Sequence, residues 1–144
     1  MPRREVKAVI ANHPTGKGKM IQANREILIV DDTAVLRNIM KMQLQRMGFS
    51  RIYEATDGSE AMKILHAQRI DLVISDWNMP VMTGFELLRE IRASEIFKDL
   101  PFIMVTAEAT EARISMALQL KVDELILKPF TLEILERKIL RVIQ

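Results

Sequence analysis

Several features that would suggest an extracellular or membrane protein are absent from this sequence of 144 residues. It contains no cysteine, which excludes disulfide bonds, thiolate metal sites and a cysteine nucleophile, and fits a reducing cytoplasm. Its apolar runs are far shorter than the ~20 residues that a membrane-spanning helix requires. The N-terminus lacks the apolar stretch of a signal peptide. We therefore expect a cytoplasmic protein without a membrane partner.

The composition is that of a globular protein whose charge is unevenly distributed. Hydrophobic residues make up 49% of the chain and charged residues 28%, so a packed core is expected. The net charge is +2, but residues 1–25 alone carry +5 and the remainder −3. The basic character belongs to the N-terminal segment, and we do not expect the folded part to bind nucleic acid.

The sequence divides at residue 26. Residues 1–25 mix glycine, proline and scattered lysines and are predicted to form a basic, flexible extension, whereas residues 26–144 are predicted to form one domain. Gly16-Lys17-Gly18-Lys19 superficially suggests a phosphate-binding loop. That motif requires glycine where His13 stands and serine or threonine where Met20 stands, so we reject it.

From residue 26 onward, short apolar runs alternate with segments of helical periodicity. The runs are Ile27–Val30, Ile52–Tyr53, Leu72–Ile74, Phe102–Val105 and Leu125–Leu127. The intervening segments repeat apolar residues at helical spacing, beginning at Leu36, Ala61, Phe85, Ile114 and Leu132. This pattern predicts an α/β fold: a (βα)5 doubly wound parallel five-stranded sheet, flavodoxin-like, with strand order 2-1-3-4-5.

Helix boundaries are also marked in the sequence. Asp57 with Glu60, and Thr83 with Glu86, have the spacing of capping boxes. Gly48 stands where the first helix should end.

Polar residues follow four of the five predicted strands. Asp31 and Asp32 follow the first strand, Asp76 the third, Thr106 the fourth and Lys128 the fifth. Ligands bind outside the carboxyl ends of parallel strands, so these side chains are expected to share one crevice. Three carboxylates there would raise the pKa of at least one of them unless a cation compensates, and an all-oxygen ligand set suits Mg²⁺. An acidic pair after a strand can also be a simple helix cap, so the prediction depends on the combination.

The combination resembles a known family. Val30-Asp31-Asp32, Ile74-Ser75-Asp76-Trp77-Asn78-Met79-Pro80, Met104 to Ala109 and Lys128-Pro129-Phe130 appear in the order and spacing of the receiver domain of two-component response regulators. The resemblance covers residues 26–143, and within the family it is greatest to the single-domain chemotaxis regulators.

The resemblance implies a phosphorylation site. Asp76 would take a phosphoryl group from a histidine kinase or phosphotransfer protein. Asp32, Asp76 and the backbone carbonyl of Asn78 would ligate Mg²⁺, with Asp31 acting through a bound water.

The remaining motif residues acquire roles in the same way. Thr106 would bind a phosphoryl oxygen and move with its loop, and Lys128 would pair with another oxygen. Lys128-Pro129 resembles a bond that is cis in the family. Asn78 and Glu108 match positions that in this family modulate the rate of phosphoryl hydrolysis.

One departure concerns the output. The family usually has an aromatic residue three positions before the lysine, where this sequence has Leu125, and residues 121–124 replace a small turn. A downstream protein target is expected to contact the face formed by the fourth helix, fifth strand and fifth helix, but its identity is open.

Two other function classes are compatible with such a sheet. One is a Mg²⁺-dependent phosphohydrolase with an aspartate nucleophile, although such enzymes usually carry a second acid where Asn78 stands. The other is a receiver-like binding module that is not phosphorylated, or a nucleotide binder. We favour the phosphoryl acceptor, which would not be an enzyme beyond self-dephosphorylation.

Overall fold

The computed structural model describes residues 24–143, and the extension predicted for residues 1–25 lies almost entirely outside this range. The strands are β1 (Glu26–Val30), β2 (Arg51–Ala55), β3 (Leu72–Asp76), β4 (Phe102–Thr106) and β5 (Glu124–Leu127). The helices are α3 (Ala34–Arg46), α4 (Gly58–Ala67), α5 (Gly84–Ala93), α6 (Glu111–Gln119) and α7 (Leu132–Val142). Strands and helices alternate strictly, as the apolar pattern predicts.

The strands form one parallel sheet in the order β2-β1-β3-β4-β5, which confirms the predicted fold class and strand order. The order reverses between β1 and β3, whose residues Ile29 and Ile74 are paired in register. The crevice at the carboxyl ends of these two strands is the switch point at which open α/β sheets bind ligands.

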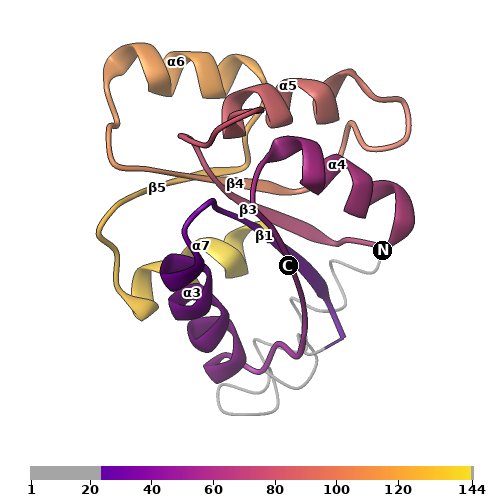
Figure 1. Ribbon diagram of the computed structural model, residues 1–144. Helices are drawn as coiled ribbons and strands as arrows, with labels where there is room; N and C mark the ends of the chain where they lie inside the picture. Colours follow the sequence, from indigo (N-terminus) through magenta and orange to yellow (C-terminus); the bar gives the residue numbers. More distant parts are fainter. Residues whose placement is uncertain (1–23, 144) are drawn as a thin grey trace.

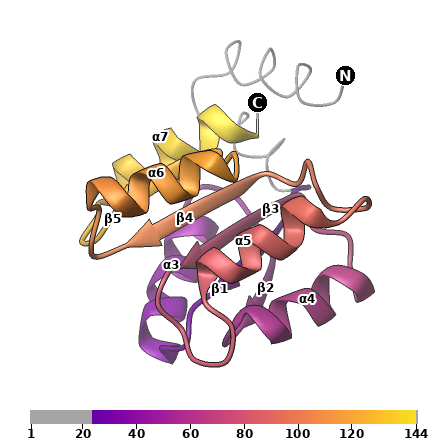
Figure 2. The same ribbon diagram turned by 90° about the horizontal axis from the view of Figure 1, so that it is seen from above.

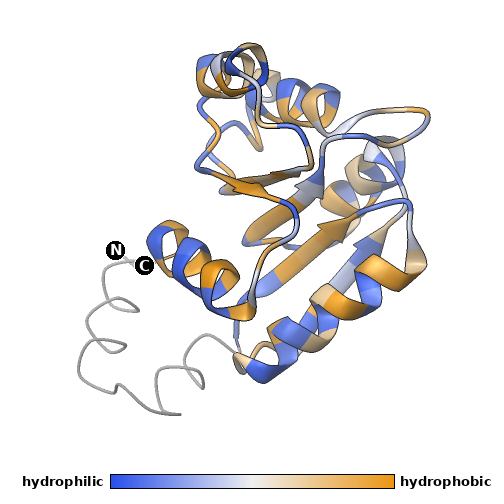
Figure 3. Ribbon diagram, turned by 90° about the vertical axis from the view of Figure 1, so that its left-hand side faces the viewer, coloured by the Kyte–Doolittle hydropathy of each residue, from blue (hydrophilic) through white to orange (hydrophobic). Residues whose placement is uncertain are grey.

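Helices cover both faces of the sheet. Helices α3 and α7 lie on one face, and α4, α5 and α6 lie on the other (Figures 1 and 2). Successive β1 residues point to opposite faces, so Ile27 and Ile29 pack with α3 and α7, whereas Leu28 and Val30 pack with the other three helices. The three central strands, β1, β3 and β4, are mostly apolar and buried on both faces, and the helices turn their apolar sides inward (Figure 3).

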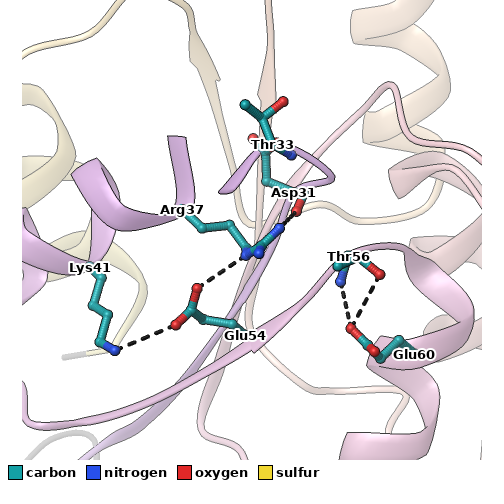
Figure 4. Close-up of polar contacts among 7 residues, drawn as sticks. All are labelled: Asp31, Thr33, Arg37, Lys41, Glu54, Thr56 and Glu60. Carbon is teal, nitrogen blue, oxygen red and sulfur yellow. Dashed lines mark hydrogen bonds and ion pairs between the residues drawn. The ribbon is translucent and has the colours of Figure 1, made fainter. Parts of the chain in front are cut away.

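Helix caps bear out most of the expected boundaries. Thr83 and Glu86 form a complete capping box at the start of α5. At α4, Asp57 accepts from the Glu60 backbone N–H at 2.9 Å, but the Glu60 carboxylate accepts from the backbone of Thr56 at 2.7 Å, one residue before the cap (Figure 4). The second predicted box is therefore only half formed.

Gly48 follows the end of α3 with φ of 104°, a left-handed conformation that glycine adopts without strain. Among the described residues, no helix is long and apolar enough to cross a membrane.

Candidate functional site

Three carboxylates meet at the switch point of the sheet. Asp31 and Asp32 follow β1, Asp76 ends β3, and one oxygen from each lies within 4.8 Å of the others. Asp31 is buried, Asp76 is partly buried and Asp32 is exposed, so the cluster opens to solvent on one side. The structure thus brings together the three acids that the sequence predicts to share a crevice.

Asp31 is held by the start of α3. Its carboxylate accepts from the backbone N–H of Thr33 at 2.9 Å, and its carbonyl accepts from Arg37 Nη1 at 2.7 Å. Arg37 in turn lies 3.0 Å from Glu54 on β2, which is also 3.5 Å from Lys41 (Figure 4). These contacts fix the loop that carries Asp31 and Asp32. Sequence reasoning did not identify Arg37 or Glu54 as part of this support.

Lys128 supplies positive charge to the cluster. Its Nζ lies 3.0 Å from Oδ1 of Asp76 and 3.7 Å from Oδ2 of Asp31. The backbone N–H of Lys128 donates to the carbonyl of Thr106 at 2.8 Å, which ties the end of β5 to the end of β4. The Lys128-Pro129 peptide bond is cis, as expected.

The pKa of Asp76 is raised above its ordinary value. Burial is the largest cause, because it disfavours the charged carboxylate, and the neighbouring charge of Asp31 raises the pKa further. The hydrogen bond and the charge of Lys128 oppose both effects. The sequence predicts a raised pKa from repulsion among the acids, whereas desolvation contributes more.

Thr106 is fully buried at the end of β4. Its hydroxyl group donates to the carbonyl of Glu108 at 3.1 Å, and its oxygen accepts from the backbone N–H of Glu108 at 3.0 Å. It also accepts from Nη1 of Arg113 at 3.1 Å. Nη2 of Arg113 donates to the side-chain oxygen of exposed Asn78 at the same distance.

Arg113 is a further residue at the site that sequence reasoning did not identify. It is an isolated cation in the first turn of α6, where an arginine on a polar helix face is unremarkable. No periodicity or motif in the sequence distinguishes it, because its partners Thr106 and Asn78 come from other segments.

A cavity of about 260 Å³ opens beside the carboxylates. Asp31, Asp76 and Lys128 line one part of it, and mostly apolar side chains from the three central strands, α3 and the segment after β5 line the rest. The phosphoacceptor candidate is thus reachable from a largely apolar opening.

Leu125 is half-buried on β5, opposite Met104 of β4. It packs against the apolar cluster beneath α4, α5 and α6. The structure therefore uses this residue in packing.

Comparison with known proteins gives a consistent result. The sequence profile of the response regulator receiver domain matches residues 27–140. The chain is 45% identical over 119 residues to the chemotaxis protein CheY of Pseudomonas aeruginosa, a match that covers 83% of this chain and 96% of that protein. It is 44% identical over 120 residues to CheY-3 of Vibrio cholerae, covering 83% and 92% of the two chains.

Solved structures resemble the fold at similar coverage. CheY4 of Vibrio cholerae superposes with a TM-score of 0.77 at 34% identity, covering 82% of this chain and 98% of that one. The receiver domain of a sensor histidine kinase from Pseudomonas aeruginosa, solved with a magnesium ion coordinated in its active site cleft, gives 0.76 at 33% identity. That match covers 84% of this chain and 98% of the other.

Proposed function

The chain belongs to the response regulator receiver family of two-component signalling, and on that premise we propose that it accepts a phosphoryl group on Asp76 in a Mg²⁺-dependent reaction. The observation that carries the proposal is the position of Lys128, 3.0 Å from the Asp76 carboxylate within the cluster of three acids. A lysine there favours the ionised form of a buried carboxylate, and only that form is nucleophilic.

The reacting group is a carboxylate oxygen of Asp76. It would attack the phosphorus of a phosphohistidine, forming an O–P bond while the N–P bond breaks and its electron pair passes to the imidazole nitrogen. Lys128 lies beside this oxygen, where it can balance the added negative charge of the product. The largely apolar cavity beside Asp76 offers an approach for the donor side chain.

The donor set fits Mg²⁺. Three carboxylates whose oxygens lie within 4.8 Å of one another, one of them exposed, form the hard, oxygen-only and partly hydrated site that this ion prefers. Asp32, Asp76 and the carbonyl of Asn78 would hold the ion directly and Asp31 through water. When bound, Mg²⁺ would neutralise charge on the transferring phosphoryl oxygens.

CheY-like receiver domains take phosphate from histidine kinases and act on downstream targets. The hydroxyl of Thr106 would bind a phosphoryl oxygen and draw residues 107–110 with it. This change would reach α6 directly, since Thr110 caps that helix. Leu125 has no hydroxyl to exchange between water and a partner, so we assign the main readout to this loop and α6.

We infer further that residues 1–25 are a basic extension and that residues 26–144 are a receiver domain acting in the cytoplasm. The downstream target would bind the face formed by α6, β5 and α7. The protein would act as a signalling switch and not as an enzyme that turns over an external substrate.

Mass spectrometry after incubation with a small acyl phosphate tests the proposed reaction. We expect one phosphoryl group per chain, dependent on Mg²⁺ and absent in Asp76→Asn. Lys128→Ala should alter phosphoryl stability or signalling, because it removes a charge contact and leaves the nucleophile in place. Stoichiometric modification of Asp76→Asn at another residue, or steady release of phosphate from general phosphomonoesters, would contradict the proposal.

A further inference from the structure

The guanidinium of Arg113 connects α6 to the end of β4 and to the segment that follows β3. Its two terminal nitrogens donate to different acceptors, the hydroxyl of Thr106 and the side-chain oxygen of Asn78, each at 3.1 Å. Arg113 is half-buried, and its bond to Thr106 is partly shielded from water, whereas its bond to Asn78 is exposed. The planar guanidinium of arginine, with its fixed donor directions, suits such a bridge better than the ammonium group of lysine does.

An aromatic platform holds the same guanidinium in place. Its central carbon lies 4.6 Å from the centroid of the Trp77 ring, within the range of a cation–π contact. Trp77 is itself buried and stacks on Phe85 of α5, with ring centroids 5.6 Å apart and planes 14° from parallel. Since Trp77 directly follows Asp76, the guanidinium is anchored next to the phosphoacceptor candidate.

The hydroxyl of Thr106 is saturated in this arrangement. A hydroxyl offers one hydrogen and two lone pairs, and here the hydrogen goes to the Glu108 carbonyl while the lone pairs accept from Glu108 N–H and Arg113. Thr106 cannot donate to a phosphoryl oxygen without giving up its bond to the Glu108 carbonyl. If the hydroxyl moves toward Asp76, Arg113 must also follow it or release it.

Building on the proposed function, we propose that Arg113 is a positioning residue that acts as a latch on the unphosphorylated state. It holds Thr106 and Asn78 in their unphosphorylated arrangement and ties both to the first turn of α6. Its contacts therefore stabilise the resting arrangement and oppose the movement of Thr106 toward the phosphoryl group. Releasing the latch would free α6 to rearrange in the same step, which links phosphorylation to the output surface.

The latch has a measurable thermodynamic consequence. A ligand that binds the activated arrangement shows an apparent affinity reduced by the small fraction of molecules already in that arrangement. Weakening the latch raises this fraction, so a phosphoryl mimic should bind more tightly. A residue that instead held the anion directly would produce the opposite sign when weakened.

The Arg113→Lys variant distinguishes the effect of the two bridging hydrogen bonds from the effect of the positive charge. Lysine keeps the positive charge but cannot bridge two acceptors with a planar fork. Arg89→Lys is the matched control, because Arg89 contacts Phe85, the other ring of the stack, at 5.8 Å, and undergoes the same chemical change.

Isothermal titration calorimetry of the full chain with beryllofluoride, at saturating Mg²⁺, measures the apparent Kd of the phosphoryl mimic. We expect Arg113→Lys to lower the Kd about three- to tenfold, which corresponds to about 0.7–1.4 kcal/mol, the net contribution of one hydrogen bond. Arg89→Lys should leave the Kd within about twofold. An unchanged or higher Kd for Arg113→Lys, or an equal decrease in both variants, would overturn the latch.

A double-mutant cycle tests whether the effect passes through Thr106. In a Thr106→Ala background, Arg113→Lys should lose most of its effect, because the hydroxyl that it restrains is gone. A full effect in that background would refute the latch as stated. Failure of the proposed function gives a different pattern, in which the wild-type chain does not bind the mimic or Asp76→Asn binds it equally well. Either result would also refute the latch.

Discussion

Gly84 offers a test of how closely the start of α5 approaches the phosphoacceptor candidate. It is the first residue of α5, and its backbone N–H donates to the carbonyl of Trp77 at 2.9 Å. A Cβ at this position would collide with the backbone carbonyl oxygen of Asp76, would lie 3.0 Å from the carbonyl carbon and would lie 3.1 Å from Met104 Sδ. Replacing Gly84 by alanine must therefore displace the main chain of Asp76 or the start of the helix.

The expected cost follows from two opposing contributions. Alanine gains about 0.5–1 kcal/mol over glycine in a helix. Overpacking a rigid site costs typically ~1–3 kcal/mol, and the upper end applies here because Asp76 is paired with Val105 within the sheet and cannot easily yield. We expect a net loss of about 2 kcal/mol, or roughly 4–8 °C in Tm. Displacing the Asp76 carboxylate should also slow phosphorylation by about 10–100-fold.

Gly58→Ala is the matched control for this prediction. Gly58 is likewise the first residue of its helix, α4, but a Cβ there would meet only the side chain of Met82, at 2.6 Å from Cγ, 2.7 Å from Sδ and 3.0 Å from Cβ. A flexible methionine can turn away, so the loss should stay below about 1 kcal/mol and phosphorylation should proceed normally. Urea unfolding followed by circular dichroism, with mass spectrometry after an acyl phosphate, measures both effects. Equal stabilities for the two variants, with Gly84→Ala phosphorylated at the wild-type rate, would refute the reasoning.

Asp76→Asn should stabilise the fold at pH 7, because the pKa of Asp76 is raised in the folded state and ionising this carboxyl group is therefore less favourable there than in the unfolded chain. The contribution of Asp76 to stability is fully present below its unfolded pKa and is lost as the pH rises through its folded pKa. The advantage of the variant in thermal unfolding should therefore shrink toward about pH 4. Mg²⁺ should bind weakly and change the fluorescence of Trp77, and an unchanged titration in Asp32→Ala would count against the metal site. Arg92→Ala should lower the free energy of unfolding in urea by about 2–4 kcal/mol, because this partly buried guanidinium, whose pKa is lowered by burial, donates to four backbone carbonyls and to Asp123. A loss below about 1 kcal/mol would contradict this role. Leu125→Ala should lower stability by about 1–3 kcal/mol but keep the phosphoryl-dependent change in amide exchange across residues 106–128. Thr106→Ala should lose that change, and the reverse result for the two variants would contradict a readout through the Thr106 loop.

The sequence by itself determined the fold class and the composition of the crevice. Doubly apolar runs such as Ile27–Val30 can be satisfied only between two helical layers, and parallel strands necessarily place their carboxyl ends at one edge. For these reasons Asp31, Asp76 and Lys128 could be assigned to one site without coordinates.

The tertiary structure decided which of these groups touch and what surrounds them. The pairing of Lys128 with both Asp76 and Asp31, and the predominance of burial in raising the Asp76 pKa, depend on distances and solvent exposure that no spacing encodes. The bridge from Arg113 to Thr106 and Asn78 joins three segments that are separate in the chain. A local pattern records the period of an element and the order of the strands, whereas a side chain's reach across elements is set only when the helices have packed onto the sheet.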